Sequence, residues 1–260
     1  MTFLCPKTVW TRRPSIGNMS ITVLSAGKTK TVAAVDDPEQ VVLTFRDDIT
    51  AGDGKKHDLL PGKGRINATI TAKLYELFSQ DAIPNHLIKQ VDDTRLLVKK
   101  LKMIPVEVVC RIRAAGHFIG IGRGFQSGDR LPFPIVEFYL KDDALHDPLL
   151  TDEHLKIMKL ANEDEIEQMR HMTLKAVRLL EKFFEEREAI LVDFKLEFGR
   201  DSNGRMVIGD ELSPDSWRLW DRETMEILDK DRFRKGLPRI FELGYQEPFR
   251  RICGDFGLLR

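Results

Sequence analysis

The sequence predicts an α+β fold in which strands come first and a few helices are mixed with them. Runs rich in β-branched residues open the ordered part of the chain over residues 21–45. Apolar residues recur at helical spacing over residues 65–80 and again over 164–188. Two further strand-like runs flank Asn203-Gly204, a pair typical of a tight hairpin turn. No internal repeat interrupts this order.

The first part of the chain is expected to form strands around a single helix. The helix over residues 65–80 ends before Pro84, because proline interrupts helical hydrogen bonding. The polar, glycine-rich segment 46–64 is too long for a simple connector, and such loops are usually functional or mobile. The strands of this part are expected at residues 21–35, 41–45, 86–91 and 94–101, and the strand over 105–113 belongs to the second part.

The second part is expected to begin with Pro105, which stands at the head of a strand and marks a hinge between two lobes. A glycine-dense loop or hairpin over 114–129, a strand over 135–141 and a helix from Thr151 or Asp152 follow it. The helix over 164–188 has one apolar stripe that should face the core, formed by Ile166, Met169, Thr173, Val177, Leu180 and Phe184.

The domain prediction is therefore a loose N-terminal extension over residues 1–20, a β-rich lobe over 21–104 and an α+β lobe over 105–260. With 260 residues, 42% of them hydrophobic, the chain has material for a core, which excludes a disordered protein. No apolar run reaches the roughly 18 residues of a membrane span.

The charge balance and the cysteines indicate which partners and which cellular compartment to expect. Forty-one basic residues balance 41 acidic ones, whereas a general nucleic-acid binder usually has a basic excess. We therefore expect no nucleic-acid or membrane partner, and any bound anion should be held by a local cluster. Cys5, Cys110 and Cys253 are widely separated and odd in number, as expected for reduced thiols of a cytoplasmic protein.

The strand ILVDFKLEFG has one apolar face and one face that includes Asp193, Lys195 and Glu197. If Asn203-Gly204 forms a two-residue turn, paired residue numbers sum to 407, and Glu197 lies directly opposite Asp210. Facing carboxylates repel unless a cation lies between them, and Mg²⁺ bound to one or two carboxylates and substrate phosphates fits best. The alternative is an exposed charged face on an edge hairpin whose register is one residue different.

Two basic clusters suggest anion binding. Lys28 and Lys30 lie in GKTK, at a turn between two expected strands, where a glycine-containing hairpin can cover nucleotide phosphates. Ordinary surface lysines are the alternative, because no P-loop is present. Arg111, Arg113 and Arg218 form the second cluster, since guanidinium groups bind phosphate or carboxylate bidentately. A salt-bridged surface is the alternative here.

Six strings in order resemble the SAICAR synthetase family, the phosphoribosylaminoimidazole-succinocarboxamide synthases. The resemblance runs from Gly27 to Arg234, and the strings are GKTKTV, FRDDITAGDG, LVKKLKMIPVEVVCRIRAAG, FYLKDDALHDP, ILVDFKLEFG and GDELSPDSWRLWD. It implies an ATP-dependent ligase of purine biosynthesis that joins L-aspartate to the carboxylate of carboxyaminoimidazole ribonucleotide (CAIR). The products are SAICAR, ADP and phosphate, formed through an acyl phosphate.

The resemblance also implies a fold related to ATP-grasp enzymes and protein kinases, with ATP between two lobes, Mg²⁺ on its phosphates and a homodimeric assembly. Carried onto this chain, it assigns catalytic roles to Lys28, Lys30, Lys195 and Asp53. The ATP contacts implied are Lys28, Lys30, Lys141 and the segment from Lys100 to Met103, and the metal ligands are Glu197 and Asp210.

The CAIR contacts implied are Arg111, His117, Asp215 and Arg218. His117 is a departure, because the family usually has a serine there that donates to the CAIR phosphate; an imidazole N–H can donate as well. Two other functions stay open: a phosphotransferase that uses the same Mg²⁺ pair without an amine acceptor, and a catalytically silent, nucleotide-binding paralogue.

Overall fold

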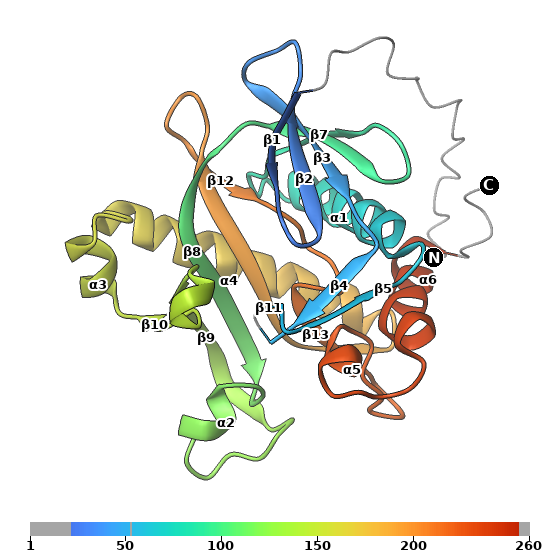
Figure 1. Cartoon of the computed structure of the whole chain (residues 1–260). Helices are drawn as coiled ribbons and strands as arrows, with labels where there is room; N and C mark the ends of the chain where they lie inside the picture. The colour runs from blue at the N-terminus through green and yellow to red at the C-terminus, as the bar shows by residue number, and fades with distance from the viewer. Residues whose placement is uncertain (1–21, 53, 255–260) are drawn as a thin grey trace, which may run out of the picture.

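The computed structural model describes residues 22–52 and 54–254, and Figure 1 shows two antiparallel sheets with helices packed against them. The predicted α+β class is therefore confirmed. The predicted N-terminal extension 1–20 and the predicted catalytic residue Asp53 lie outside the described residues. Among the helices that the structure describes, none is both long enough and apolar enough to cross a membrane.

The first sheet has five strands and lies entirely within residues 22–99. Its order is β1-β2-β3-β7-β6, and a separate two-stranded ribbon of β4 and β5 follows β3 in the chain. The β1–β2 turn contains Lys28, so the predicted lysine turn between two strands is confirmed. The strands are β1 (Thr22–Ala26), β2 (Lys30–Ala34), β3 (Gln40–Phe45), β4 (Asp48–Ala51), β5 (Lys56–Leu59), β6 (Leu87–Gln90) and β7 (Arg95–Lys99).

The second sheet has six strands, with β11 at its centre. Strand β8 pairs with one edge of β11, while β13 and β12 pair with the first and last parts of its other edge. The strands are β8 (Lys102–Arg113), β9 (Arg130–Leu140), β10 (Leu149–Leu150), β11 (Ala189–Arg200), β12 (Met206–Gly209) and β13 (Trp217–Asp221).

Two long helices supply much of the core. Helix α4 (Glu163–Glu185) buries every residue of its predicted stripe and starts at an Asn162–Glu165 capping box. Helix α1 (Lys63–Gln80) packs against both sheets, since Ala68 and Ala72 belong to the apolar cluster of the first sheet and Ile66 and Ile70 to that of the second. The remaining helices are α2 (Phe118–Ile121), η1 (Asp143–Leu145), α3 (Asp152–Ile157), α5 (Asp231–Arg234), η2 (Glu242–Gln246) and α6 (Glu247–Cys253).

Two local predictions are wrong. Pro105 lies inside β8 rather than at its head, because the β8–β11 register shifts between the pairs Glu197–Glu107 and Gly199–Met103. A proline has no N–H to donate to a ladder, and such an irregularity is where a strand tolerates it. The segment after β8, expected to be a loop or hairpin, contains the short helix α2.

Candidate active site

Two adjoining cavities mark the candidate active site, where the first sheet meets the ends of β11 and β12. The larger, of about 760 Å³, is polar and includes Lys28 and Lys30 among its lining residues. The smaller, of about 460 Å³, is lined largely by apolar side chains of β2, β3, β7 and β8. Lys141, Glu197 and Asp210 line both cavities, so the predicted metal carboxylates lie at their junction.

The predicted hairpin register is wrong by one residue. Glu197 pairs with Gly209, so paired numbers sum to 406, and Asp210 lies just beyond β12. The cause is the turn: the Asp201 carboxylate accepts hydrogen bonds from the backbone N–H groups of Asn203 and Arg205, both at 2.9 Å. With this Asx-type turn, the loop contains the five residues 201–205, whereas the prediction assumed a loop of Asn203 and Gly204 alone.

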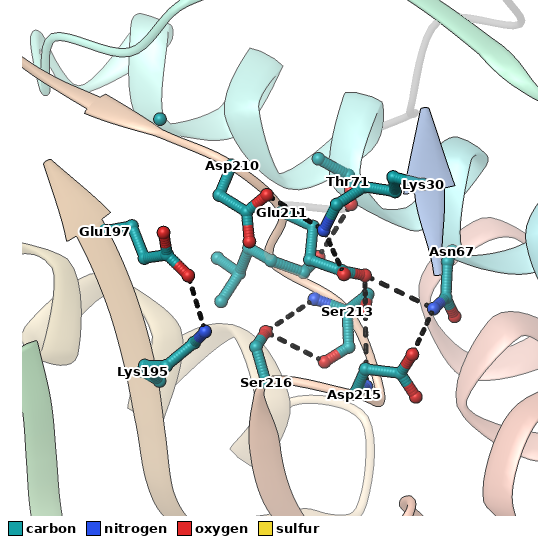
Figure 2. Close-up of polar contacts among 12 residues, drawn as sticks. Lys30, Asn67, Thr71, Lys195, Glu197, Asp210, Glu211, Ser213, Asp215 and Ser216 are labelled. Carbon is teal, nitrogen blue, oxygen red and sulfur yellow. Dashed lines mark hydrogen bonds and ion pairs between the residues drawn. The ribbon is translucent and has the colours of Figure 1, made fainter. Parts of the chain in front are cut away.

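The two carboxylates nevertheless border the same space, because the backbone turns at Asp210. Its φ is +57°, in the left-handed region that a regular strand does not use. At this point the chain leaves β12, and the Asp210 side chain lies near Lys30, whose Nζ is 2.8 Å from Asp210 Oδ1 (Figure 2). Lys30 also donates to Oε1 of Glu211.

Glu197 is bound by two lysines. Its carboxylate accepts from Lys141 Nζ at 2.6 Å and from Lys195 Nζ at 2.7 Å. Lys195 also donates to Glu107 at 2.8 Å, and Glu107 is the residue directly opposite Glu197 in the β8–β11 ladder. A facing pair of carboxylates therefore exists, but Glu107 supplies the second one.

Mutual attraction keeps these groups charged despite burial. Burial alone disfavours the ionised forms, yet Lys30 and Lys195 lower the pKa of Asp210 below its ordinary value. Burial likewise opposes protonation of Lys195, but the Glu197 and Glu107 carboxylates raise its pKa well above the usual range. At neutral pH, lysine ammonium groups and carboxylates therefore lie next to one another in the site, both in their charged forms.

The donor set fits a hard divalent cation that also binds phosphate. Within residues 22–52 and 54–254, no group of three or more His, Cys, Asp or Glu side chains is arranged to hold a metal ion. Mg²⁺ needs only one or two protein carboxylates when phosphates and water complete its coordination. Glu197 and Asp210, which now bind lysine ammonium groups at the shared wall, offer such oxygens.

The other predicted nucleotide residues also lie around these cavities. Lys100 and Met103 line the smaller cavity, and Lys195, which was predicted as a catalytic residue, lines the larger one. Lys28 forms an ion pair with Asp143 of η1 at 2.7 Å, which connects the β1–β2 turn to the second part of the chain. All the described nucleotide-side residues of the prediction are therefore brought together.

The predicted CAIR residues form two groups. Asp215 lines the larger cavity and is buried between Lys63 Nζ at 2.6 Å and the Tyr245 hydroxyl at 2.6 Å. Arg111 and Arg218 instead converge on Asp193, whose Oδ2 is 2.8 Å and 2.7 Å from their NH1 atoms.

Neither arginine, nor His117, is among the described residues that line the two cavities. His117 lies edge-on to Tyr139, with ring centroids 6.5 Å apart, and the Tyr139 hydroxyl accepts from Arg111. Arg113, predicted to belong to the same basic cluster as Arg111, donates to the carbonyl of Gly128 and shares no partner with Arg111 in the described part of the chain.

Comparison with known proteins identifies the family. A profile of the SAICAR synthetase family matches residues 23–252. The chain belongs to the SAICAR synthetase family. It is an enzyme, a ligase of purine biosynthesis, as its curated relatives of this family are.

Sequence relatives and solved structures agree. The phosphoribosylaminoimidazole-succinocarboxamide synthase of Methanocaldococcus jannaschii is 44% identical over 236 residues, covering 91% of this chain and 95% of that protein. The enzyme of the same name from Campylobacter curvus is 44% identical over 227 residues, covering 87% and 95%. A structure of SAICAR synthetase (Type-2) in complex with ADP has a TM-score of 0.85 at 39% identity, over 91% of this chain and 98% of that one.

Several charged residues of this candidate site were not predicted from the sequence. Glu211 follows Asp210 directly and binds Lys30. The prediction considered only residues that alternate on one face of two paired strands, and Glu211 lies beyond β12. Lys230 and Arg234 line the larger cavity. They belong to a run of charged residues, and such a run is also common where an exposed helix begins, so the sequence did not mark them. Lys63 is fully buried although it lies within the glycine-rich segment 46–64, and no signal in the sequence marked it.

Proposed function

We propose that the chain is an ATP-dependent ligase that joins L-aspartate to the carboxylate of CAIR, releasing SAICAR, ADP and phosphate. One observation carries the proposal: lysines and carboxylates alternate where a polar cavity meets an apolar one. A nucleotide has the same division, with a flat base at one end and a chain of phosphates at the other. A relative of this chain has been solved with ADP.

The base of ATP would lie in the smaller cavity, against side chains such as Val98, Leu101 and Met103. Its phosphates would then extend into the larger cavity, toward Lys28 and Lys30. Both lysines sit in or beside the β1–β2 turn, and Lys28 would exchange its exposed partner Asp143 for phosphate oxygens. Lys141 would contribute a further ammonium group at the junction.

Glu197 and Asp210 would hold Mg²⁺, and the ion, when bound, would neutralise charge on the phosphates as phosphoryl transfer proceeds. The chain's own task is to place reactants and to stabilise charge. Lys195, fixed by Glu107 and Glu197, offers its ammonium group to the carboxylate or phosphate oxygens at the same wall. Its rigid position means that little reorganisation is needed when charge develops.

The chemistry runs in two steps. A carboxylate oxygen of CAIR attacks the γ-phosphorus of ATP, and the bond from that phosphorus to ADP breaks, which gives an acyl phosphate. The nitrogen of aspartate then attacks the acyl carbon, and the carbon–oxygen bond to phosphate breaks. The nitrogen gives up two protons in passing from ammonium to amide. ATP is needed because a free carboxylate is a poor acyl donor.

CAIR would lie between Asp215 and the Arg218 side of the site. Arg218 is the accessible arginine of the pair, with 22% of its side chain exposed compared with 5% for Arg111. We propose that Arg218 contacts the CAIR phosphate, and that Arg111 and His117 complete that end. Asp53, which lies outside the described residues, keeps its proposed catalytic role.

The broader predictions also stand as proposals. We propose two lobes, over 21–104 and 105–260, with ATP between them in the manner of ATP-grasp enzymes and protein kinases. A homodimer and a cytoplasmic location remain predictions from the family resemblance and the cysteine content.

Phosphate release from ATP tests the proposed function directly. In the presence of Mg²⁺ and CAIR, we expect phosphate to form only when L-aspartate is added, and SAICAR to form in equal amount. A phosphotransferase on the same scaffold would release ADP equally well without aspartate. A silent nucleotide-binding paralogue would gain thermal stability from Mg-ATP but turn nothing over. Either result would contradict the ligase proposal.

A further inference from the structure

Backbone carbonyl groups at the end of β12 accept hydrogen bonds from α1 and from the segment that leads into β6. The Ile208 carbonyl accepts from the backbone N–H of His86 at 2.9 Å. The Gly209 carbonyl accepts from the Tyr75 hydroxyl at 2.7 Å. The Asp210 carbonyl pairs with His86 Nε2 at 3.0 Å, and because a carbonyl can only accept, that nitrogen is the donor. Three consecutive carbonyls are thus held by two residues.

These bonds fix a conformation that the chain would not otherwise prefer. Asp210 has a φ of +57°, which is uncommon for a residue with a side chain and persists only where the surroundings determine it. The bonds from Tyr75 and His86 fall on the peptide groups on either side of this α-carbon. They therefore determine which way the Asp210 carboxylate points.

Both donors are themselves held rigidly. Tyr75 is fully buried and His86 is 3% exposed, and their rings meet edge to face with centroids 5.5 Å apart. Neither side chain reaches the Asp210 carboxylate, whose partner is Lys30. Their hydrogen bonds act on the carboxylate through the backbone, since both are made to carbonyl groups.

We propose that Tyr75 and His86 are positioning residues that hold Asp210 in its left-handed conformation and so direct its carboxylate into the metal site. This inference rests on the proposed role of Asp210 as a ligand of Mg²⁺. His86 also lines the smaller cavity, the one proposed for the base of ATP. One side chain thus forms part of the nucleotide wall and part of the support for the metal ligand.

The test separates metal-dependent from metal-independent nucleotide binding. Calorimetry would measure the Kd of ADP in Mn²⁺, which prefers the same oxygen ligands as Mg²⁺, and again in EDTA. For Tyr75→Phe, which removes one hydroxyl, we expect the Kd in Mn²⁺ to rise about 10-fold, as for residues that orient metal ligands. The Kd in EDTA should stay within about 2-fold of wild type. An unchanged Kd in Mn²⁺ would overturn the inference.

His86 gives a second pair of variants in case Tyr75→Phe folds poorly. His86→Gln keeps an N–H that can reach the Asp210 carbonyl, whereas His86→Leu removes it. We expect Gln to retain more of the Mn²⁺-dependent affinity than Leu at equal melting temperature. Equal losses for the two variants would mean that the ring only fills space, which contradicts a positioning role.

Thr71→Val is the matched control. Thr71 lies one helical turn before Tyr75 on α1, is fully buried, and donates to the carbonyl of Leu212, two residues after Asp210 (Figure 2). It should leave both Kd values unchanged, and a rise equal to that of Tyr75→Phe would contradict the inference. If instead wild type binds ADP equally in Mn²⁺ and EDTA, and Asp210→Asn does the same, the proposed metal site itself fails.

Discussion

Glu107 lies directly opposite Glu197 across the β8–β11 ladder, and Lys195 Nζ donates to both carboxylates, at 2.8 Å and 2.7 Å. Like charges placed opposite each other destabilise a sheet. Lys195 stands two residues before Glu197, on the same face of β11, and supplies the charge that makes this pairing stable. The arrangement fixes the position of an ammonium group at the proposed site of phosphoryl transfer.

Without the Lys195 ammonium group, the repulsion between the Glu107 and Glu197 carboxylates should destabilise the fold. We expect Lys195→Met to lower the free energy of unfolding by about 1–3 kcal/mol, because the buried Glu197 and the half-buried Glu107 lose their shared partner. Adding Glu107→Gln should recover part of this stability, since one of the repelling charges is gone, but not the turnover. Urea unfolding of the two single variants and the double variant gives the interaction free energy between Lys195 and Glu107. Strictly additive losses would show that Lys195 does not bridge the pair.

The Lys28–Asp143 pair should oppose nucleotide binding slightly. Its side chains are 43% and 61% exposed, and surface pairs of this kind contribute about 0–1 kcal/mol. Asp143→Asn should therefore leave the melting temperature nearly unchanged while lowering the KM for ATP, since Lys28 no longer has to leave a carboxylate.

Glu163→Gln breaks a comparable surface pair with Lys156 and serves as control; it should change neither quantity. A higher KM for ATP in Asp143→Asn would mean that Asp143 assists binding, contrary to this view.

Arg218 should contribute to CAIR affinity more than to turnover. It bridges Asp193 at 2.7 Å and Asp231 at 2.9 Å, which presents its guanidinium group at a fixed angle. Arg218→Ala should raise the KM for CAIR by about 10-fold or more with a smaller change in kcat, because a charge-assisted hydrogen bond to phosphate is lost. Arg130→Ala, which breaks the exposed pair with Glu181, should leave both constants unchanged. A fall in kcat alone would contradict the assignment.

Asp229 should give the protein a pH-dependent stability. Burial, and then the negative charge of Asp231, raise the pKa of the Asp229 carboxyl to about 7. Between its ordinary pKa of 3.8 and about 7, the folded protein holds this proton more tightly than the unfolded chain does. Its contribution is therefore complete below about pH 4 and is lost as the pH rises through 7.

Urea unfolding at about pH 5, 6 and 7 measures this effect. Relative to Asp229→Asn, wild type should lose up to about 1.4 kcal/mol of unfolding free energy per pH unit. Stability curves that stay parallel across this range would show that Asp229 does not take up a proton in the folded state.

The sequence predicted the parts of this molecule that depend on local patterns. The apolar stripe of α4 and the turn between β1 and β2 follow from spacing and composition, and both were correct. The alternation in β11 likewise placed Lys195 and Glu197 on one face, where the structure brings them within 2.7 Å. Each of these results needs only the residue pattern of one short stretch of sequence.

The failures depend on side chains that compete with backbone rules or on contacts between distant segments. The Asp201 carboxylate accepts backbone hydrogen bonds within the hairpin loop and so lengthens the loop. The partner of Glu197 is therefore Gly209 and not Asp210. No pattern within β8 shows that Glu107 will face Glu197, because that register is fixed by the whole sheet. The burial of Lys63 similarly depends on Asp215, 152 positions later in the chain.

Transfer of an oxygen atom from CAIR to phosphate is the most direct test of the central claim, that the site activates a carboxylate as an acyl phosphate. CAIR labelled with ¹⁸O in its carboxylate would be converted with ATP, Mg²⁺ and L-aspartate, and the released phosphate analysed by mass spectrometry. We predict one ¹⁸O atom in each phosphate and the other in the new amide carbonyl. Phosphate without ¹⁸O, formed together with SAICAR, would contradict the account.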